Sequence, residues 1–275
     1  MKVLGLIKLL ALLVAIDLGT PAAAMAQPAS PSASKADDVI TYYYGDPRLE
    51  RLERLERLER LVGVLDAFGK RHQDWVAYPP VAGFFAVVFA TQPGWIEKLV
   101  PAQLDARLAT TIAAALQLAG QPVSKGLQAR LAQSGTDPTL VGQFVGLPGR
   151  LTDLRIAIPT HLDILWGASF ASGDGRYALM VADFFARTAN RSEAMALDIT
   201  RIVAGMVRRD YSDLAKLKDK YEPALLRDMV YAATAAWALT SNARQHAFID
   251  SVVSRYISEH SGTLAAKVLS VMKGS

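Results

Sequence analysis

Apolar positions along most of the chain follow a helical period. From residue 78 onward they recur at three- and four-residue spacing, and short turns rich in Gly, Pro, Asn and Asp interrupt them. Caps and prolines at these turns predict helices over 81–91, 103–119, 123–133, 161–172, 176–189, 193–208, 211–221, 223–240, 243–260 and 263–273, with a further helix beginning at 138. We therefore expect an all-α fold of stacked antiparallel helical hairpins, either an α-solenoid-like superhelix or a layered bundle, without a substantial sheet.

Several turns carry capping residues. Thr160, Ser192 and Asn242 precede apolar segments at the position where a side-chain oxygen accepts a backbone N–H group. In the turn Gly173-Asp174-Gly175, the first glycine is expected to end one helix in a left-handed conformation and the aspartate to cap the next. Residues 142–159 hold several Gly and Pro residues and are the best candidate for an internal break.

The segment before the helices has a different composition. Residues 27–38 are rich in Pro, Ser and Ala without an apolar period, so they bury too little surface to offset the entropy of ordering. Residues 39–44 (VITYYY) are β-branched and aromatic but form one isolated run. We expect residues 27–45 to form a flexible or extended arm that packs on the helices, and residues 46–275 to form the helical domain.

Residues 49–61 repeat Leu-Glu-Arg with a period of three. These residue types favour helix. A period of three turns the leucine stripe by about 60° at each step, so the stripe cannot form one straight coiled-coil seam. One interpretation is a helix for dimerisation or partner docking. The other, which the absence of a heptad favours, is an exposed helix lengthened by duplication.

Residues 1–26 have the features of a secretory signal peptide. Lys2 and Lys8 supply positive charge, Leu9 to Ile16 form an apolar run, and Ala24-Met25-Ala26 has the small-residue pattern of a cleavage site. Lys8 and Asp17 interrupt the apolar stretch well short of the ~20 residues that a spanning helix needs. We expect cleavage after Ala26, a periplasmic or secreted location, and no membrane insertion afterwards.

Composition excludes several classes of site. The chain has no cysteine, so disulfides, thiolate metal sites and a cysteine nucleophile are excluded. Its formal net charge of +4 comes from 30 basic and 26 acidic residues that alternate along the chain. Phosphate backbones are bound by clustered basic faces, so no nucleic-acid partner is expected. The sequence also lacks phosphate-binding glycine loops, nucleophile elbows and local metal motifs, so no cofactor and no metal are expected.

One hairpin, Leu165 to Ala189, carries a more specific pattern. A bulky residue next to glycine (Trp166-Gly167) and an aromatic residue are followed by the Gly-Asp turn, and then by Ala178 and Phe184 on the second helix. This set resembles a tetratricopeptide repeat, in which a small residue on one helix admits a large residue from the next.

The resemblance covers about one hairpin. The turn comes one residue early, the usual helix-ending proline is missing, and a second hairpin around Trp237, Phe248 and Tyr256 repeats the set only in part. The resemblance implies a scaffold that binds a partner and no particular chemistry.

The four histidines are the remaining candidates for chemistry. No two of them lie three or four residues apart, so a local two-histidine metal site is excluded. His246 and Asp250 share a helical face, where the carboxylate could orient the imidazole as a general base. His161 has an acidic neighbour in Asp163.

Both histidine neighbourhoods also have a structural interpretation, which the sequence favours. Asn242 and Gln245 have the spacing of a capping box ahead of a helix that would hold the second histidine in its first turn. Thr160 and Asp163 have the same spacing, which explains that aspartate without a functional role.

The leading hypothesis is an exported helical-repeat scaffold for protein–protein interaction in the cell envelope. The residues that we expect at its partner surface are Trp166, Arg176, Trp237, Asn242 and Arg244. Both tryptophans are also typical of core positions. An envelope-stability protein without a specific ligand is not distinguished from this hypothesis by sequence.

The alternative is a hydrolase-like enzyme with a site assembled from helix termini. The residues that would form it are His161, Asp174, Arg176, His246 and Asp250. One concave pocket that collects His246, Asp250 and Arg176 would favour the enzyme, whereas a broad groove lined by exposed aromatic residues would favour the scaffold.

Overall fold

The computed structural model describes residues 36–45 and 52–274, which form an all-α structure. No strand occurs among these residues, so the expected all-α fold without a substantial sheet is confirmed. The signal peptide with its cleavage site, the beginning of the predicted arm and residues 46–51 lie outside the described residues.

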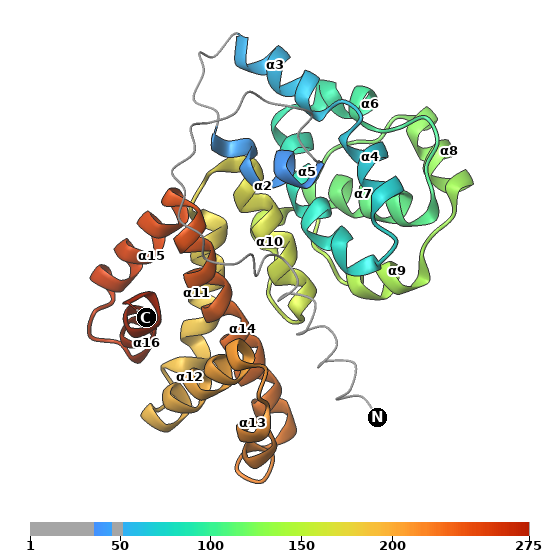
Figure 1. The fold of residues 1–275 in the computed structure, drawn as a ribbon. Helices are drawn as coiled ribbons and strands as arrows, with labels where there is room; N and C mark the ends of the chain where they lie inside the picture. Colours follow the sequence, from blue (N-terminus) through green and yellow to red (C-terminus); the bar gives the residue numbers. More distant parts are fainter. Residues whose placement is uncertain (1–35, 46–51, 275) are drawn as a thin grey trace.

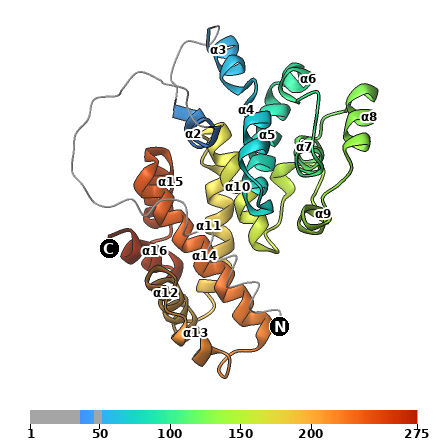
Figure 2. The same ribbon diagram turned by 45° about the vertical axis from the view of Figure 1, so that its right-hand side comes forward.

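A central helix, α10 (Pro159–Ser172), lies between two groups of helices (Figures 1 and 2). The group that precedes it in the chain comprises α2 (Ala36–Tyr42), η1 (Tyr43–Gly45), α3 (Leu52–Leu61), α4 (Val64–Arg71), η2 (Trp75–Ala77), α5 (Tyr78–Thr91), η3 (Pro93–Trp95), α6 (Ile96–Leu99), α7 (Ala106–Ala119), α8 (Lys125–Ser134), α9 (Pro138–Phe144) and η4 (Leu151–Asp153). The group that follows it comprises α11 (Arg176–Ala189), α12 (Glu193–Arg208), α13 (Ser212–Leu217), α14 (Pro223–Gln245), α15 (Ala247–Glu259) and α16 (Leu264–Gly274).

Helices α5 and α10 approach each other so closely that their backbones touch. A Cβ atom on Gly83 of α5 would lie 1.8 Å from the carbonyl oxygen of Ile164, and one on Gly167 of α10 would lie 1.8 Å from that of Pro80. Glycine on both helices permits this approach, because no side chain separates the two backbones. The expectation that Gly167 admits a large residue from the next helix is therefore wrong, since its open face meets α5 and not α11.

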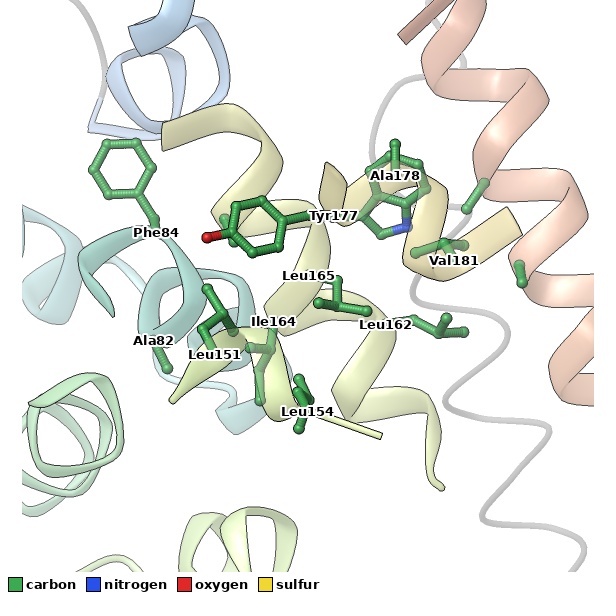
Figure 3. Close-up of a cluster of buried hydrophobic side chains, with 14 of the residues drawn as sticks. Ala82, Phe84, Leu151, Leu154, Leu162, Ile164, Leu165, Tyr177, Ala178 and Val181 are labelled. Carbon is green, nitrogen blue, oxygen red and sulfur yellow. The ribbon is translucent and has the colours of Figure 1, made fainter. Parts of the chain in front are cut away.

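The apolar core continues from this crossing on both sides of α10 (Figure 3). Ala82 and Phe84 of α5 lie on one side, and Tyr177, Ala178 and Val181 of α11 lie on the other. Side chains of α10 fill the space between them, among them Leu162, Ile164 and Leu165. Burial of this apolar surface stabilises the chain, which has no cysteine.

The predicted internal break at 142–159 overlaps the end of α9 and the first residue of α10, and between these helices it is irregular, with one 3-10 turn at η4. Its leucines nevertheless belong to the core. Leu147, Leu151 and Leu154 are buried, and Figure 3 shows the last two beside α5 and α10. The segment therefore leads the chain from α9 back to the core before α10 begins.

The part of the predicted arm that the structure describes is helical and not extended. Residues 36–42 form α2 and residues 43–45 form η1. Val39, Ile40 and Tyr43 are buried, and the Tyr43 ring lies edge-on to Phe84 with 5.3 Å between centroids. An isolated run has no strand to pair with in an all-helical chain, so a helix satisfies its backbone groups locally despite its β-prone side chains.

Most helix boundaries agree with the capping signals. Helices α11 and α12 span the predicted residues, and Ser192 accepts a hydrogen bond from the backbone N of Met195 at 3.2 Å. Gly173 ends α10 in the left-handed region, with φ 63°. Asp174 accepts a hydrogen bond from the backbone N of Arg176 at 2.9 Å, although the N-cap position of α11 is held by Gly175 and not by this aspartate.

Two capping predictions are wrong. Helix α14 runs through Asn242 and ends at Gln245, so the boundary with α15 lies at His246. Thr160 lies inside α10, where its hydroxyl donates to the Gln143 side chain at 2.6 Å and does not cap. In both places tertiary contacts override a local preference, because buried neighbours decide where the backbone can turn.

The described part of the Leu-Glu-Arg segment forms α3, and the leucines described there differ strongly in burial. Leu55 is 66% exposed, whereas Leu58 is 8% and Leu61 is 0% exposed. The period of three explains the trend, because each leucine is rotated relative to the last and the stripe cannot keep one direction along the helix.

By length and composition, no single described helix could cross a membrane. The segments Trp75–Thr91 and Pro93–Leu99 would meet that test only if taken together, and they are bent by 112° at their junction.

Asp198 ties α12 to the segment between α13 and α14. Its carboxylate is 1% exposed and accepts hydrogen bonds from Lys220 at 2.6 Å, from the Tyr221 hydroxyl at 2.8 Å and from Arg201 at 2.8 Å. Burial alone would raise the pKa of Asp198, but these three donors outweigh it and hold the pKa below its ordinary value.

Acid is expected to weaken this cluster. Because the pKa of folded Asp198 lies below the ordinary 3.8, its contribution to stability is present above that value and is lost as the pH falls through the folded pKa. Asp198→Asn should lower the free energy of unfolding by about 1–2 kcal/mol at neutral pH and by less at pH ~3. Urea unfolding at both pH values measures this loss of unfolding free energy, with Asp213→Asn on α13 as the control. The same loss for Asp198→Asn at both pH values would contradict the expectation.

Candidate functional site

A hollow of about 490 Å³ lies where α3, the end of α5 and the α10–α11 turn meet. Its volume is within the range of ligand-binding pockets. The lining residues come from five separate segments of the chain: Tyr43; Arg54 and Arg57; Val87, Val88, Thr91 and Gln92; Trp95; and Ala171, Ser172, Asp174, Arg176 and Tyr177. We call this hollow the arginine pocket.

Helix ends and turns position most of this lining. Helix α5 ends at Thr91, and the following Pro93-Gly94 turn places Trp95 in η3 at the rim. The left-handed Gly173 turns the chain sharply from α10 into α11, so residues on both sides of the turn face the same hollow. The site therefore depends on backbone that packing against α5 holds in place.

The charged side chains of the arginine pocket are predominantly basic. Three guanidinium groups, those of Arg54, Arg57 and Arg176, face one carboxylate, that of Asp174, so the lining carries two net positive charges. The Asp174 carboxylate forms an ion pair with the neighbouring Arg176 side chain. Arg54 has no hydrogen-bond or ion-pair partner among the described residues.

Three aromatic side chains, those of Tyr43, Trp95 and Tyr177, also line the arginine pocket. The Arg57 guanidinium lies 5.2 Å from the centroid of the Tyr43 ring, close enough for a cation–π interaction. Burial raises the pKa of Tyr43, which Arg57 and Arg60 partly offset, and burial also raises the pKa of Tyr177. Both phenols therefore stay protonated at neutral pH and can donate hydrogen bonds to a ligand.

Of the residues predicted for an enzyme, only Asp174 and Arg176 line the arginine pocket. His246 is 1% exposed at the α14–α15 boundary, where its Nδ1 and the Tyr44 hydroxyl share a hydrogen bond of 2.7 Å. This bond joins residues 202 positions apart, so a distant tyrosine and not the predicted capping box holds the His246 side chain. Burial lowers its pKa, so the ring is neutral at pH 7.

The predicted pairing of this histidine with Asp250 is also absent from the structure. Asp250 forms an ion pair with Lys273 at 2.8 Å, whereas rings of Tyr42, Phe170 and Phe248 surround the imidazole. Its Nε2 is buried without a partner among the described residues. The carboxylate therefore does not orient the imidazole as a base.

His161 has partners of its own near the start of α10. Its Nδ1 lies 2.9 Å from the carbonyl oxygen of Arg155 and 3.2 Å from the backbone N of Ala157. Burial lowers its pKa, which the bond to Arg155 partly offsets. Among the described residues, no hydrogen bond joins it to Asp174 or to the second histidine.

The residues predicted for a partner surface are dispersed. Arg176 lines the arginine pocket, whereas Arg244 donates to the carbonyl oxygen of Met272 at 3.0 Å. Asn242 is a partly buried residue within α14. Trp166 is 7% exposed and belongs to the core. Trp237 is partly buried and packs against the core.

The two tryptophans share a second, much smaller hollow. It holds about 20 Å³ between α10 and α14 and is lined by Pro159, Leu162, Asp163, Trp166, Thr234, Trp237 and Ala238. We call it the aspartate hollow. Its volume is close to that of one water molecule, which is too small for a larger ligand.

Asp163 is the one ionisable residue that lines the aspartate hollow. The predicted capping box does not form, because α10 already begins at Pro159, and the carboxyl has no hydrogen-bond partner among the described residues. Burial among apolar side chains raises its pKa from 3.8 to about 7. The indole N–H of Trp166 is likewise buried without a partner in the described part of the chain.

Sequence reasoning missed most of the arginine pocket. Arg54 and Arg57 were interpreted as part of an exposed helix, and Trp95 lies in a turn without a recognisable motif. The available signal is the arginine in every triplet of α3, but the triplet also contains a glutamate, so it carries no net charge. Which of the two side chains faces a hollow depends on how α3 packs.

Comparisons with protein-family models, with curated protein sequences and with solved structures found no match to this chain. Among the described residues, no group of three or more His, Asp or Glu side chains is placed to hold a metal ion. The function is therefore argued from the site alone.

Proposed function

We propose that the chain is an exported helical binding protein, and that the arginine pocket receives part of a protein partner. The observation that carries this proposal is the pocket itself, a hollow of about 490 Å³ with basic and aromatic lining at the junction of the two helix groups. Arginine and aromatic residues are the types most enriched where proteins bind one another. Residues 1–26, with the pattern of a signal peptide, support export.

The enzymatic alternative has less support. A general base must reach its substrate from within a pocket, and both candidate histidines lie outside the arginine pocket, fixed by other partners. The two candidates inside it, Asp174 and Arg176, form an ion pair with each other. This arrangement suits binding and positioning better than proton transfer.

Photo-crosslinking in cells tests the proposal. Thr91 is exposed at the pocket rim, so a photoreactive amino acid at this position should crosslink the partner that enters the pocket. Val271 on α16 is 65% exposed and does not line the pocket, which makes it the matched control position.

We expect a discrete crosslinked protein from position 91 and none of that mass from position 271. A Trp substitution at Gln92, which narrows the pocket, should weaken the product from position 91. The same products from both positions, or a product unaffected by the Gln92→Trp substitution, would contradict the proposal.

A further inference from the structure

The Leu-Glu-Arg triplets distribute their charges unequally around the arginine pocket. Arg54 and Arg57 both line it, whereas the described glutamates of α3, Glu56 and Glu59, do not. Residues three apart lie on neighbouring parts of one helix face, so a period of three brings successive arginines to the same side. Among the described side chains of this charge-balanced segment, those that line the pocket are thus basic.

Arg176 contributes a third guanidinium group from a separate helix. It comes from the start of α11, whereas the other two come from α3, so the cations approach the hollow from two different elements. Its ion pair with Asp174 holds this guanidinium at the rim. A planar guanidinium presents several N–H donors in a geometry that matches carboxylate and phosphate oxygens.

The lining between the cations mixes polar side chains with apolar and aromatic ones. Beside the polar residues Thr91, Gln92 and Ser172 it contains Val87, Val88 and the rings of Trp95 and Tyr177. A hydrated inorganic ion would leave the apolar part of this surface unused. A ligand that combines an oxyanion with an apolar or aromatic body would use both parts of the lining.

We propose that the arginine pocket recognises an oxyanion, a carboxylate or a phosphate, carried on an apolar or aromatic group, and that the Leu-Glu-Arg triplets supply two of the three cations that bind it. This inference rests on the proposed binding function and specifies the chemistry of the bound group. It assigns to the triplets a role other than dimerisation or exposed spacing.

Calorimetric titration of the purified chain with three small probes tests this chemistry. Phenyl phosphate and 3-phenylpropionate carry the two oxyanions on an aromatic body, and 3-phenylpropanamide is the neutral control. We expect both anions, or one of them, to bind at least about tenfold more tightly than the amide, and the affinity to fall as salt rises. Binding of only one anion identifies which oxyanion the pocket takes.

Two matched variants locate the binding. Arg54→Gln removes an exposed pocket arginine with no partner among the described residues, so it should fold normally and lower the anion affinity about three- to tenfold. Arg255→Gln removes an exposed arginine on α15 outside the pocket and should leave the affinity unchanged. Circular dichroism of both variants checks that the fold is intact.

The outcomes separate this inference from the proposed function. Equal binding of the amide and the anions, or equal affinity of the Arg54→Gln and Arg255→Gln proteins, overturns the oxyanion inference. If no probe binds but position 91 still crosslinks a partner, the oxyanion inference fails and the binding function stands. If no probe binds and no crosslink forms, both fail.

Discussion

Replacing Gly167 with alanine is expected to lower the free energy of unfolding by about 3 kcal/mol or more, because the added methyl group has no space. Its carbon would lie 1.8 Å from the carbonyl oxygen of Pro80 and 3.0 Å from the backbone N of Phe84. Backbone atoms cannot rotate away as a side chain can, so α5 and α10 must separate. In a thermal melt, the transition should fall by about 6 °C or more for a chain of this size.

A second glycine provides the control for this effect. Gly142 is an exposed residue of α9, and a Cβ atom there would meet no other atom within 4 Å. Gly142→Ala should therefore raise the free energy of unfolding by about 0.5–1 kcal/mol through helix propensity alone. Similar stabilities of the two alanine variants would show that the helices are not in backbone contact.

Replacing Asp163 with asparagine is expected to stabilise the protein at pH 8. The pKa of folded Asp163 is about 7 against an ordinary 3.8, so folding favours the protonated acid. The contribution of Asp163 to the free energy of unfolding is therefore favourable below pH 3.8, and it is lost as the pH rises through 7. Each pKa unit corresponds to ~1.4 kcal/mol, and partial exposure reduces the total, so we expect a gain on the order of 2 kcal/mol at pH 8.

Urea unfolding of the parent and the Asp163→Asn protein at pH 4, 6 and 8 measures this gain, which should be smallest at pH 4. Asp153 is exposed on η4, so Asp153→Asn serves as the control substitution at a solvent-facing carboxyl. A variant less stable than the parent at pH 8 would mean that the Asp163 carboxylate has a stabilising partner. Asp163 and Asp198 should thus respond to pH in opposite directions, since one carboxyl lacks the donors that surround the other.

Local signals are sufficient to predict the helices whose ends are capped within a few residues. Helix α12 is an example: Ser192 caps its start, and the next turn follows Arg208. The sequence predicts a helix boundary wrongly where contacts with distant residues determine its position. Asn242 has the right type for a cap, but the boundary falls four residues later, where buried His246 meets Tyr44 from the other end of the chain.

The candidate site was predictable only in part. Asp174 and Arg176 are indicated by the turn that contains them, because turns between helices expose polar residues at a rim. No sequence signal indicates Arg54 and Arg57, because each belongs to a charge-balanced triplet. The buried leucines of α3 determine which side of the helix faces the pocket. A hollow built from five segments is a property of packing and leaves no local pattern in the sequence.

The hydrogen bond between Tyr44 and His246 also imposes an order of events on folding. The two residues are 202 positions apart, and synthesis at about 5–20 residues per second separates their appearance by roughly 10–40 s. During that interval the segment around Tyr44 cannot complete its packing, although its apolar side chains already exist. The short helix η1, which holds Tyr44, must therefore wait for the α14–α15 boundary before this hydrogen bond can form.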